Sequence, residues 1–145
     1  MPPDLSRREF LEVSAAAGLT ALTVPVSARV LTREQRSTLL STARTVFPHR
    51  GVSDEPYLRA VAHVEQQCRC DFRIFHGVKT GVERLEWLSG WDFAGLPEST
   101  RVRLLKRVEH TSFFRVLYRE ILEGLYGSPE SWRLLTGAEK SKSEQ

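Results

Sequence analysis

Apolar residues recur at helical spacing along most of this chain, and this pattern limits the fold more than any other feature. It is clearest over residues 112–126, where one stripe contains Phe113, Phe114, Leu117, Ile121, Leu122 and Leu125. Residues three and four positions apart share one face of an α-helix, so the stripe predicts a helix with a buried side. The chain has no credible run of alternating strand residues and no internal repeat. We therefore predict an all-α fold.

The first helix of the body is expected over residues 33–47. Thr32 and Gln35 have the spacing of a capping box, in which side chains satisfy backbone N–H groups at a helix N-terminus. Pro48 and Gly51 would end the helix. Its apolar stripe would contain Leu39, Ala43, Val46 and Phe47.

Two more helices are expected between residues 53 and 89, separated by an ambiguous segment. The first, capped by Ser53 or Asp54, would carry Tyr57, Val61, Val64 and Cys68 at nearly helical spacing. Residues 71–78 stay ambiguous because Gly77 weakens a continuous helix. The second would cover about 79–89, with Val82, Leu85 and Leu88 on its apolar side.

The stretch "SGWDFAGLPEST" has the composition of a loop, and Pro97 suits the first turn of another helix. That helix would bury Val102, Leu105 and Val108. Gly127, Ser128 and Pro129 would end the helix over 112–126. We thus predict a compact bundle of four to five short helices over 29–136, followed by a disordered polar tail over 137–145.

Size and charge restrict the classes of function. The 145 residues leave room for one domain. The formal net charge of +3 is spread along the chain, without the concentrated basic patch that nucleic-acid binding needs. No apolar run is long enough for a conventional membrane span. We expect neither nucleic-acid binding nor a membrane helix.

Residues 1–28 have the pattern of an export signal. Five residues match the S-R-R-x-F-L pattern of a twin-arginine signal, although Glu12 stands where Lys usually follows: Ser6, Arg7, Arg8, Phe10 and Leu11. The Ala- and Thr-rich stretch over 13–26 is too short and too polar for a transmembrane helix. Small residues up to Ala28 predict cleavage between Ala28 and Arg29. The other interpretation is a basic amphipathic N-terminus that stays attached.

A twin-arginine signal has a physical implication for so small a chain. The twin-arginine translocase takes proteins that fold before export, often with a cofactor inserted, whereas a small cofactor-free helical domain could travel unfolded. One economical explanation is that this chain exports another protein, already folded and bound to it.

The two cysteines are the first candidates for chemistry. Cys68 lies on the apolar stripe of its helix and is expected to be buried, whereas Cys70 would face outward. An exposed thiol in an oxidising compartment favours an intermolecular disulfide at Cys70. A metal site from His63, Cys68, Cys70 and His76 is disfavoured, because residues 68 and 70 point about 200° apart on a helix.

Other catalytic and cofactor patterns are missing from the sequence. The four histidines are scattered, and none accompanies a nucleophile and an orienting group. The chain has no C-x-x-C-H for covalent haem and no G-x-G-x-x-G for a dinucleotide. We therefore predict no catalytic residue, no metal ligand and no cofactor on this chain.

Aromatic residues are the candidates for a partner interface. Trp87, Trp91 and Phe93 gather around the predicted loop, and Trp132 follows the last predicted helix. They either cover one end of the helical core or anchor a partner, because Trp and Tyr are enriched at interfaces. The candidate interface residues are Trp87, Trp91, Phe93, Phe113, Phe114, Tyr126 and Trp132.

Three segments in order resemble the gluconate 2-dehydrogenase subunit 3 family. The segment "LTREQRSTLLSTARTVFPH" resembles its opening helix, and "FAGLPESTRVRLLKRVE" resembles its F-x-x-L-P segment and the following helix. "FFRVLYREILEGLYGSPESW" resembles its last helix and tail. The segments cover most of residues 31–136. Relatives often extend further after the Trp, whereas this chain ends in "GAEKSKSEQ".

The resemblance implies a non-catalytic small subunit of a membrane-associated, FAD-dependent sugar or sugar-acid dehydrogenase. In such assemblies a large flavoprotein of the glucose-methanol-choline type holds FAD, and a cytochrome c subunit often takes the electrons. The large chain usually lacks an export signal, so the small chain escorts it to the periplasmic face of the inner membrane. The resemblance does not indicate the substrate.

Two other interpretations stay open. The chain could be a stand-alone exported binding domain without a dehydrogenase partner. It could also be a small metal-dependent enzyme that uses the Cys–His region.

Overall fold

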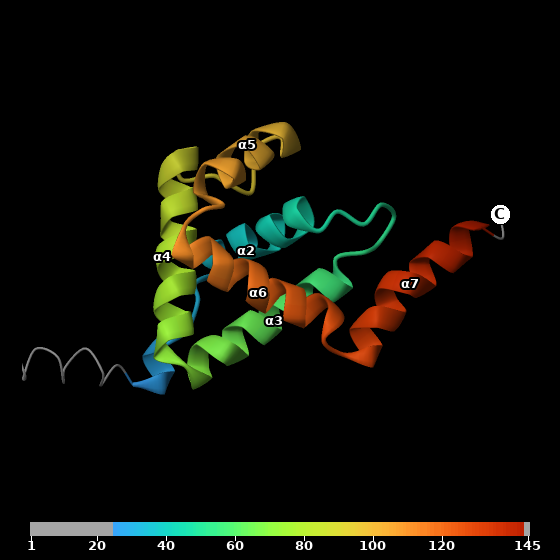
Figure 1. Cartoon of the computed structure of the whole chain (residues 1–145), viewed down its shortest axis with the longest axis horizontal. Coiled ribbons are helices and arrows are strands. Elements are labelled where there is room, and N and C mark those ends of the chain that lie inside the picture. The colour runs from blue at the N-terminus through green and yellow to red at the C-terminus, as the bar shows by residue number, and fades with distance from the viewer. Residues whose placement is uncertain (1–24, 144–145) are drawn as a thin grey trace, which may run out of the picture.

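The computed structural model describes residues 25–143, and this part of the chain is all-helical (Figure 1). A short 3-10 helix, η1 (Val26–Ala28), precedes six α-helices. These are α2 (Arg33–Val46), α3 (Glu55–Cys70), α4 (Phe72–Ser89), α5 (Glu98–Val108), α6 (Ser112–Tyr126) and α7 (Pro129–Ser143). The predicted all-α class is confirmed. The twin-arginine motif, Ser6 to Leu11, lies outside the described residues.

The start of α2 has the predicted capping box. The Thr32 hydroxyl accepts a hydrogen bond from the Gln35 backbone N–H at 3.2 Å, and the Thr32 N–H donates to Gln35 Oε1 at 2.9 Å. Asp54 holds the N-cap position of α3, but its carboxylate pairs with Arg44 of α2 instead of capping the helix. That ion pair connects the two helices at one end.

Helix α4 corrects the predicted boundary near residue 79, because it is continuous from Phe72. The Asp71 carboxylate caps it by accepting from the Arg73 N–H at 2.7 Å. Gly77 does not interrupt the helix, since the packing of α4 outweighs the weak propensity of one glycine. Another glycine, Gly81, has a structural role: a Cβ there would lie 2.4 Å from the ring of Phe113 on α6.

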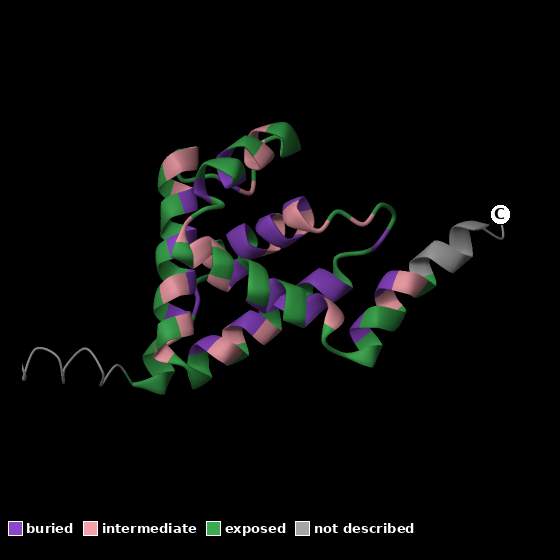
Figure 2. Cartoon of the chain, viewed as in Figure 1, coloured by how far each residue is buried: buried purple, intermediate pink, exposed green. Residues whose placement is uncertain are grey.

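The bundle encloses two adjoining apolar clusters. The larger is formed mainly by α2, α3, α4 and α6, and the smaller by α4, α5 and the loop between them. Phe113 packs against both clusters. Helices α3 and α6 make the most extensive helix pair, and α6 crosses α3 in Figure 1. Figure 2 shows buried positions along the inward faces of these helices, as the apolar stripes predict.

Helix α7 was not among the predicted elements, and it corrects the count of four to five helices. Its backbone is helical to Ser143, which lies within the polar tail predicted over 137–145. The Ser128 hydroxyl accepts from the Ser131 N–H at 3.1 Å, and Pro129 and Glu130 suit a first helical turn. The Gly-Ser-Pro sequence that ends α6 therefore also begins α7.

None of the helices in the described range combines the length and the apolar character needed to cross a lipid bilayer.

Candidate functional site

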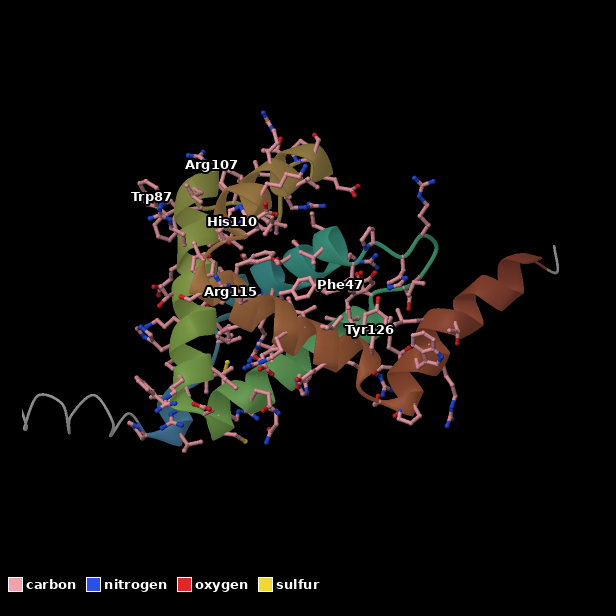
Figure 3. The ribbon with its side chains drawn as sticks, viewed as in Figure 1. Phe47, Trp87, Arg107, His110, Arg115 and Tyr126 are labelled. Atoms are coloured by element: carbon pink, nitrogen blue, oxygen red, sulfur yellow. The ribbon has the colours of Figure 1, made fainter. Side chains whose placement is uncertain are left out.

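The most exposed aromatic side chains of the predicted interface set lie at the C-terminal end of α4. Trp87 is 62% exposed and Trp91 is 69% exposed. The Arg84 guanidinium lies over the Trp87 ring, 5.3 Å from its centroid. Figure 3 shows Trp87 and Arg107 at the same end of the molecule, away from α7. We refer to Trp87 and Trp91 together as the tryptophan pair.

An unusual backbone conformation holds Trp91 in this position. Gly90 ends α4 with φ of 72°, and Trp91 follows with φ of 70°, which makes it the one non-glycine residue with positive φ in the described part of the chain. The Trp91 N–H donates to the Glu86 carbonyl at 2.7 Å and closes the helix end. A side chain in the left-handed region costs free energy, and such strain often marks functional positions.

Phe93, another residue of the predicted interface set, is fully buried in the smaller apolar cluster. The two left-handed residues reverse the chain after α4, so Phe93 enters the core while Trp91 stays in solvent. Phe113 and Phe114 are also core residues, half-buried between helices. The loop contains an exposed residue, Trp91, two positions from a buried one, Phe93. No periodic pattern in the sequence distinguishes the two.

Trp132 lies on α7 and belongs to a different surface. It is 54% exposed and its ring centroid is 6.0 Å from that of half-buried Tyr126. Helix α7 lies on the opposite side of the molecule from α4 (Figure 1). The structure therefore divides the predicted interface set into the tryptophan pair, a separate Trp132 surface, and core aromatics.

Polar contacts of Tyr126 and Tyr57 connect the loop after α2 to the core. The Tyr126 hydroxyl lies 2.7 Å from His49 Nε2. The fully buried Tyr57 donates to the Phe47 carbonyl at 2.6 Å and accepts from the His49 N–H at 3.1 Å. Burial raises the pKa of both tyrosines above the usual value of a phenol. These contacts explain why Tyr126, a predicted interface residue, is held in a structural network.

The cysteines have the environments that helical spacing predicts. Cys68 is buried in the larger cluster and Cys70 is exposed. Burial, together with the negative charges of Glu120 and Glu65, raises the pKa of the Cys68 thiol to about 12. Cys68 is therefore protonated and unreactive at neutral pH. Cys70 stays a candidate for an intermolecular disulfide.

The predicted cleavage site lies at the edge of the described residues. Ala28 is exposed at the end of η1, and Arg29 donates to the Arg69 carbonyl of α3 at 3.2 Å. The Arg29 guanidinium also lies over the Phe72 ring, 5.6 Å from its centroid. A chain that begins at Arg29 would keep both contacts, because they involve only the Arg29 side chain.

Sequence reasoning missed the group of side chains with metal-binding character. Of the disfavoured set His63, Cys68, Cys70 and His76, only His63 belongs to the close group of potential metal ligands found among the described residues. His63 of α3 lies beside two carboxylates of α6, Glu120 and Glu123, which are three residues apart. The available signal was Glu120 itself, a charged residue within the apolar stripe of its helix.

Comparison of the chain with protein-family models, with curated proteins and with solved structures found no match. The family resemblance therefore rests on the sequence motifs.

Proposed function

We propose that this chain is the non-catalytic small subunit of a periplasmic FAD-dependent gluconate or sugar dehydrogenase complex. It binds the folded flavoprotein subunit in the cytoplasm and escorts it through the twin-arginine translocase. In this proposal FAD belongs to the large, glucose-methanol-choline type subunit, and haem c belongs to a cytochrome subunit. The chain itself supplies a binding surface and an export signal, and its complex lies at the periplasmic face of the inner membrane.

The observation that carries the partner-binding role is the exposed tryptophan pair at the end of α4. Trp side chains are frequent anchors of protein interfaces, so two exposed indoles at one end of a helix are candidates for contact with a partner. Trp91 is held outward although its backbone is in the left-handed region. The strained backbone of Trp91 does not bury the indole within this chain. Such strain is consistent with selection for contact with a partner.

The sequence supports the remaining parts of the proposal. The arginine pair at positions 7 and 8 favours export of a folded complex, and the three ordered segments favour a flavoprotein dehydrogenase as the partner. The helical fold described above is compatible with an accessory subunit. The alternative is a stand-alone exported binding domain that uses the same surface for another ligand.

Co-purification tests the proposal directly. The chain would be tagged at its C-terminus, expressed in its native host, and purified from membranes solubilised in mild detergent. We expect a second, larger chain and the visible absorption bands of an oxidised flavin. A single colourless chain from both the membrane and the soluble fractions would favour the stand-alone binding domain.

A further inference from the structure

His63, Glu120 and Glu123 bring three potential metal ligands together at the crossing of α3 and α6. The His63 Nε2 atom lies 3.5 Å from Glu120 Oε2 and 3.8 Å from Glu123 Oε2, and the three ligand atoms all lie within 4.8 Å of one another. Zinc bonds to imidazole nitrogen and carboxylate oxygen are about 2.0–2.2 Å, which places tetrahedral ligands about 3.4 Å apart. The separations of His63 Nε2 from the two carboxylate oxygens are close to that value.

The hydrogen bonds of these side chains leave His63 Nε2 and Glu120 Oε2 available to bind a metal ion. His63 Nε2 is buried and has no hydrogen-bond partner among the described residues, although the His63 side chain is 29% exposed. The Glu120 side chain is only 3% exposed, and Arg119 donates to its Oε1 atom at 2.9 and 3.0 Å. Glu120 Oε2 is directed toward His63 instead. An unpaired buried nitrogen facing a buried carboxylate is costly unless a cation or proton joins them.

Packing holds the two helices at the separation that the cluster requires. Gly124 follows Glu123 on α6, and a Cβ at this glycine would lie 2.7 Å from the Ala60 Cα atom of α3. Ala60 is one turn before His63. The close backbone approach therefore fixes the imidazole relative to the two carboxylates, and a preorganised ligand set binds a metal without reordering the chain.

The surroundings of the cluster provide access from solvent. The cluster adjoins a surface pocket between α3, α6 and the start of α7, lined by Arg59, His63, Glu123, Gly127, Ser128 and Ser131. Glu123 lines this pocket and its side chain is exposed, whereas the Glu120 side chain is buried. A bound ion would thus have three protein ligands and an open position toward water.

We propose that His63, Glu120 and Glu123 bind one divalent transition-metal ion of the Zn²⁺ type. One imidazole and two carboxylates suit Zn²⁺, Co²⁺ or Mn²⁺ better than Cu⁺, which prefers thiolates. Together with Arg119, the two carboxylates carry a net charge of about −1, which favours a cation over an anion in this position. The proposal does not rest on the proposed function, because it concerns the purified chain alone.

Metal titration tests the proposal. The parent protein is the full chain without a histidine tag and with Cys70→Ser, because the exposed thiol would bind Zn²⁺ by itself. After treatment with a chelator, the protein is titrated with ZnCl₂ by calorimetry and with CoCl₂ by visible absorption. We expect one ion per chain, and Co²⁺ bands typical of a nitrogen–oxygen ligand set.

Two ligand variants and one control separate this site from adventitious surface binding. Glu123→Gln changes an exposed side chain and is expected to lower Zn²⁺ affinity at least about 10-fold, and His63→Gln about 100-fold or more. His110→Gln is the matched control, because His110 and Glu109 form an exposed histidine–carboxylate pair 3.4 Å apart. Circular dichroism confirms that each variant is folded.

The outcomes decide the proposal. Stoichiometric binding that His63→Gln and Glu123→Gln weaken and His110→Gln does not would support it. If the parent binds neither Zn²⁺ nor Co²⁺ at micromolar concentrations, or if all three variants bind equally, the cluster is only an ion pair and the proposal is wrong. A flavoprotein partner found by co-purification would leave either result unchanged.

Discussion

Gly124 of α6 lies directly against Ala60 of α3, so that a Cβ at position 124 would come within 2.7 Å of the Ala60 Cα atom and 3.0 Å of its carbonyl oxygen. These are backbone atoms, which cannot rotate away as a flexible side chain can. The contact therefore sets the separation of the two helices that make the most extensive pair in the bundle. It also sets the distance between His63 and Glu120, which lie on the same two helices.

Gly124→Ala should destabilise the protein by about 1–3 kcal/mol, because the added methyl group forces α3 and α6 apart. Chemical denaturation followed by circular dichroism measures this loss. Gly137→Ala is the matched control, since nothing lies within 4 Å of a Cβ at that helical glycine. There we expect unchanged or slightly higher stability, because alanine is the better helix former. Equal stability of the two variants would contradict the close-contact interpretation.

Trp91→Gly should have opposite effects on stability and on partner binding. Glycine accepts a φ of 70° without strain, so the free energy of unfolding is expected to rise by up to about 1 kcal/mol. Capture of the flavoprotein subunit should fall, because the exposed indole is lost. Thermal unfolding and quantitative pull-down measure the two effects.

Trp132→Ala is the comparison for that experiment, since it removes an exposed indole from α7 on the other side of the molecule. If the tryptophan pair is the interface, Trp132→Ala retains the partner while Trp91→Gly and Trp87→Ala do not. The reverse pattern would move the proposed interface to α7.

Tyr57→Phe should cost about 1–3 kcal/mol of stability, because it leaves the Phe47 carbonyl and the His49 N–H without their buried partner. Urea unfolding gives the value. Tyr118→Phe serves as the control, since the Tyr118 side chain is 41% exposed, and this variant should unfold like the parent protein. A small effect of Tyr57→Phe would mean that water replaces the hydroxyl.

The two thiols should differ in reactivity and in their effect at alkaline pH. At pH 8, a thiol reagent should modify Cys70 alone in the folded protein and both cysteines in denaturant. Because the folded-state pKa of Cys68 is raised from 9.0 to about 12, its contribution to stability is complete below pH 9 and is lost between pH 9 and 12. The check is the number of thiols that the reagent modifies in the Cys70→Ser variant. We expect none before the protein unfolds.

Replacement of Arg7 and Arg8 by Lys should retain both the chain and the flavoprotein in the cytoplasm. Under the proposed function, the twin-arginine translocase would recognise the arginine pair, and the partner would travel only as a bound passenger. Dehydrogenase activity in periplasmic and cytoplasmic fractions measures the effect. Export of the activity at the parent level would contradict the escort mechanism, whatever happens to the small chain.

Local signals were sufficient for much of the fold. The capping box at Thr32 and Gln35 and the ends of α2 and α6 agree with the structure. The predicted stripe on α6 is buried at Leu117, Ile121 and Leu125, whereas Leu122 is exposed. Single glycine and proline residues predict a weak point at Gly77 and no helix after Tyr126. In the structure, packing stabilises α4 across Gly77, and capping at Ser128 begins α7. The Ser-Pro pair ends one helix and begins the next, but its sequence pattern by itself predicts only the end of a helix.

Less of the candidate functional site could be predicted from the sequence, because the site depends on contacts between residues that are distant in the chain. Periodicity indicated that Cys68 is buried and Cys70 exposed, since both belong to one helix. It gave no means to distinguish Phe93, which is buried, from Trp91, which is exposed, because their positions depend on two left-handed residues at the end of α4. Aromatic composition alone therefore produced an interface set that the structure divides.

The sequence by itself determined the helical class, most helix boundaries and the buried faces, because these follow from spacing and capping within about 15 residues. Tertiary structure decided which helices touch and which polar groups meet. His63 and Glu120 are far apart in the chain, and only the close crossing at Ala60 and Gly124 brings them within 3.5 Å. Contacts of this kind depend on how complementary surfaces pack, which no local pattern encodes.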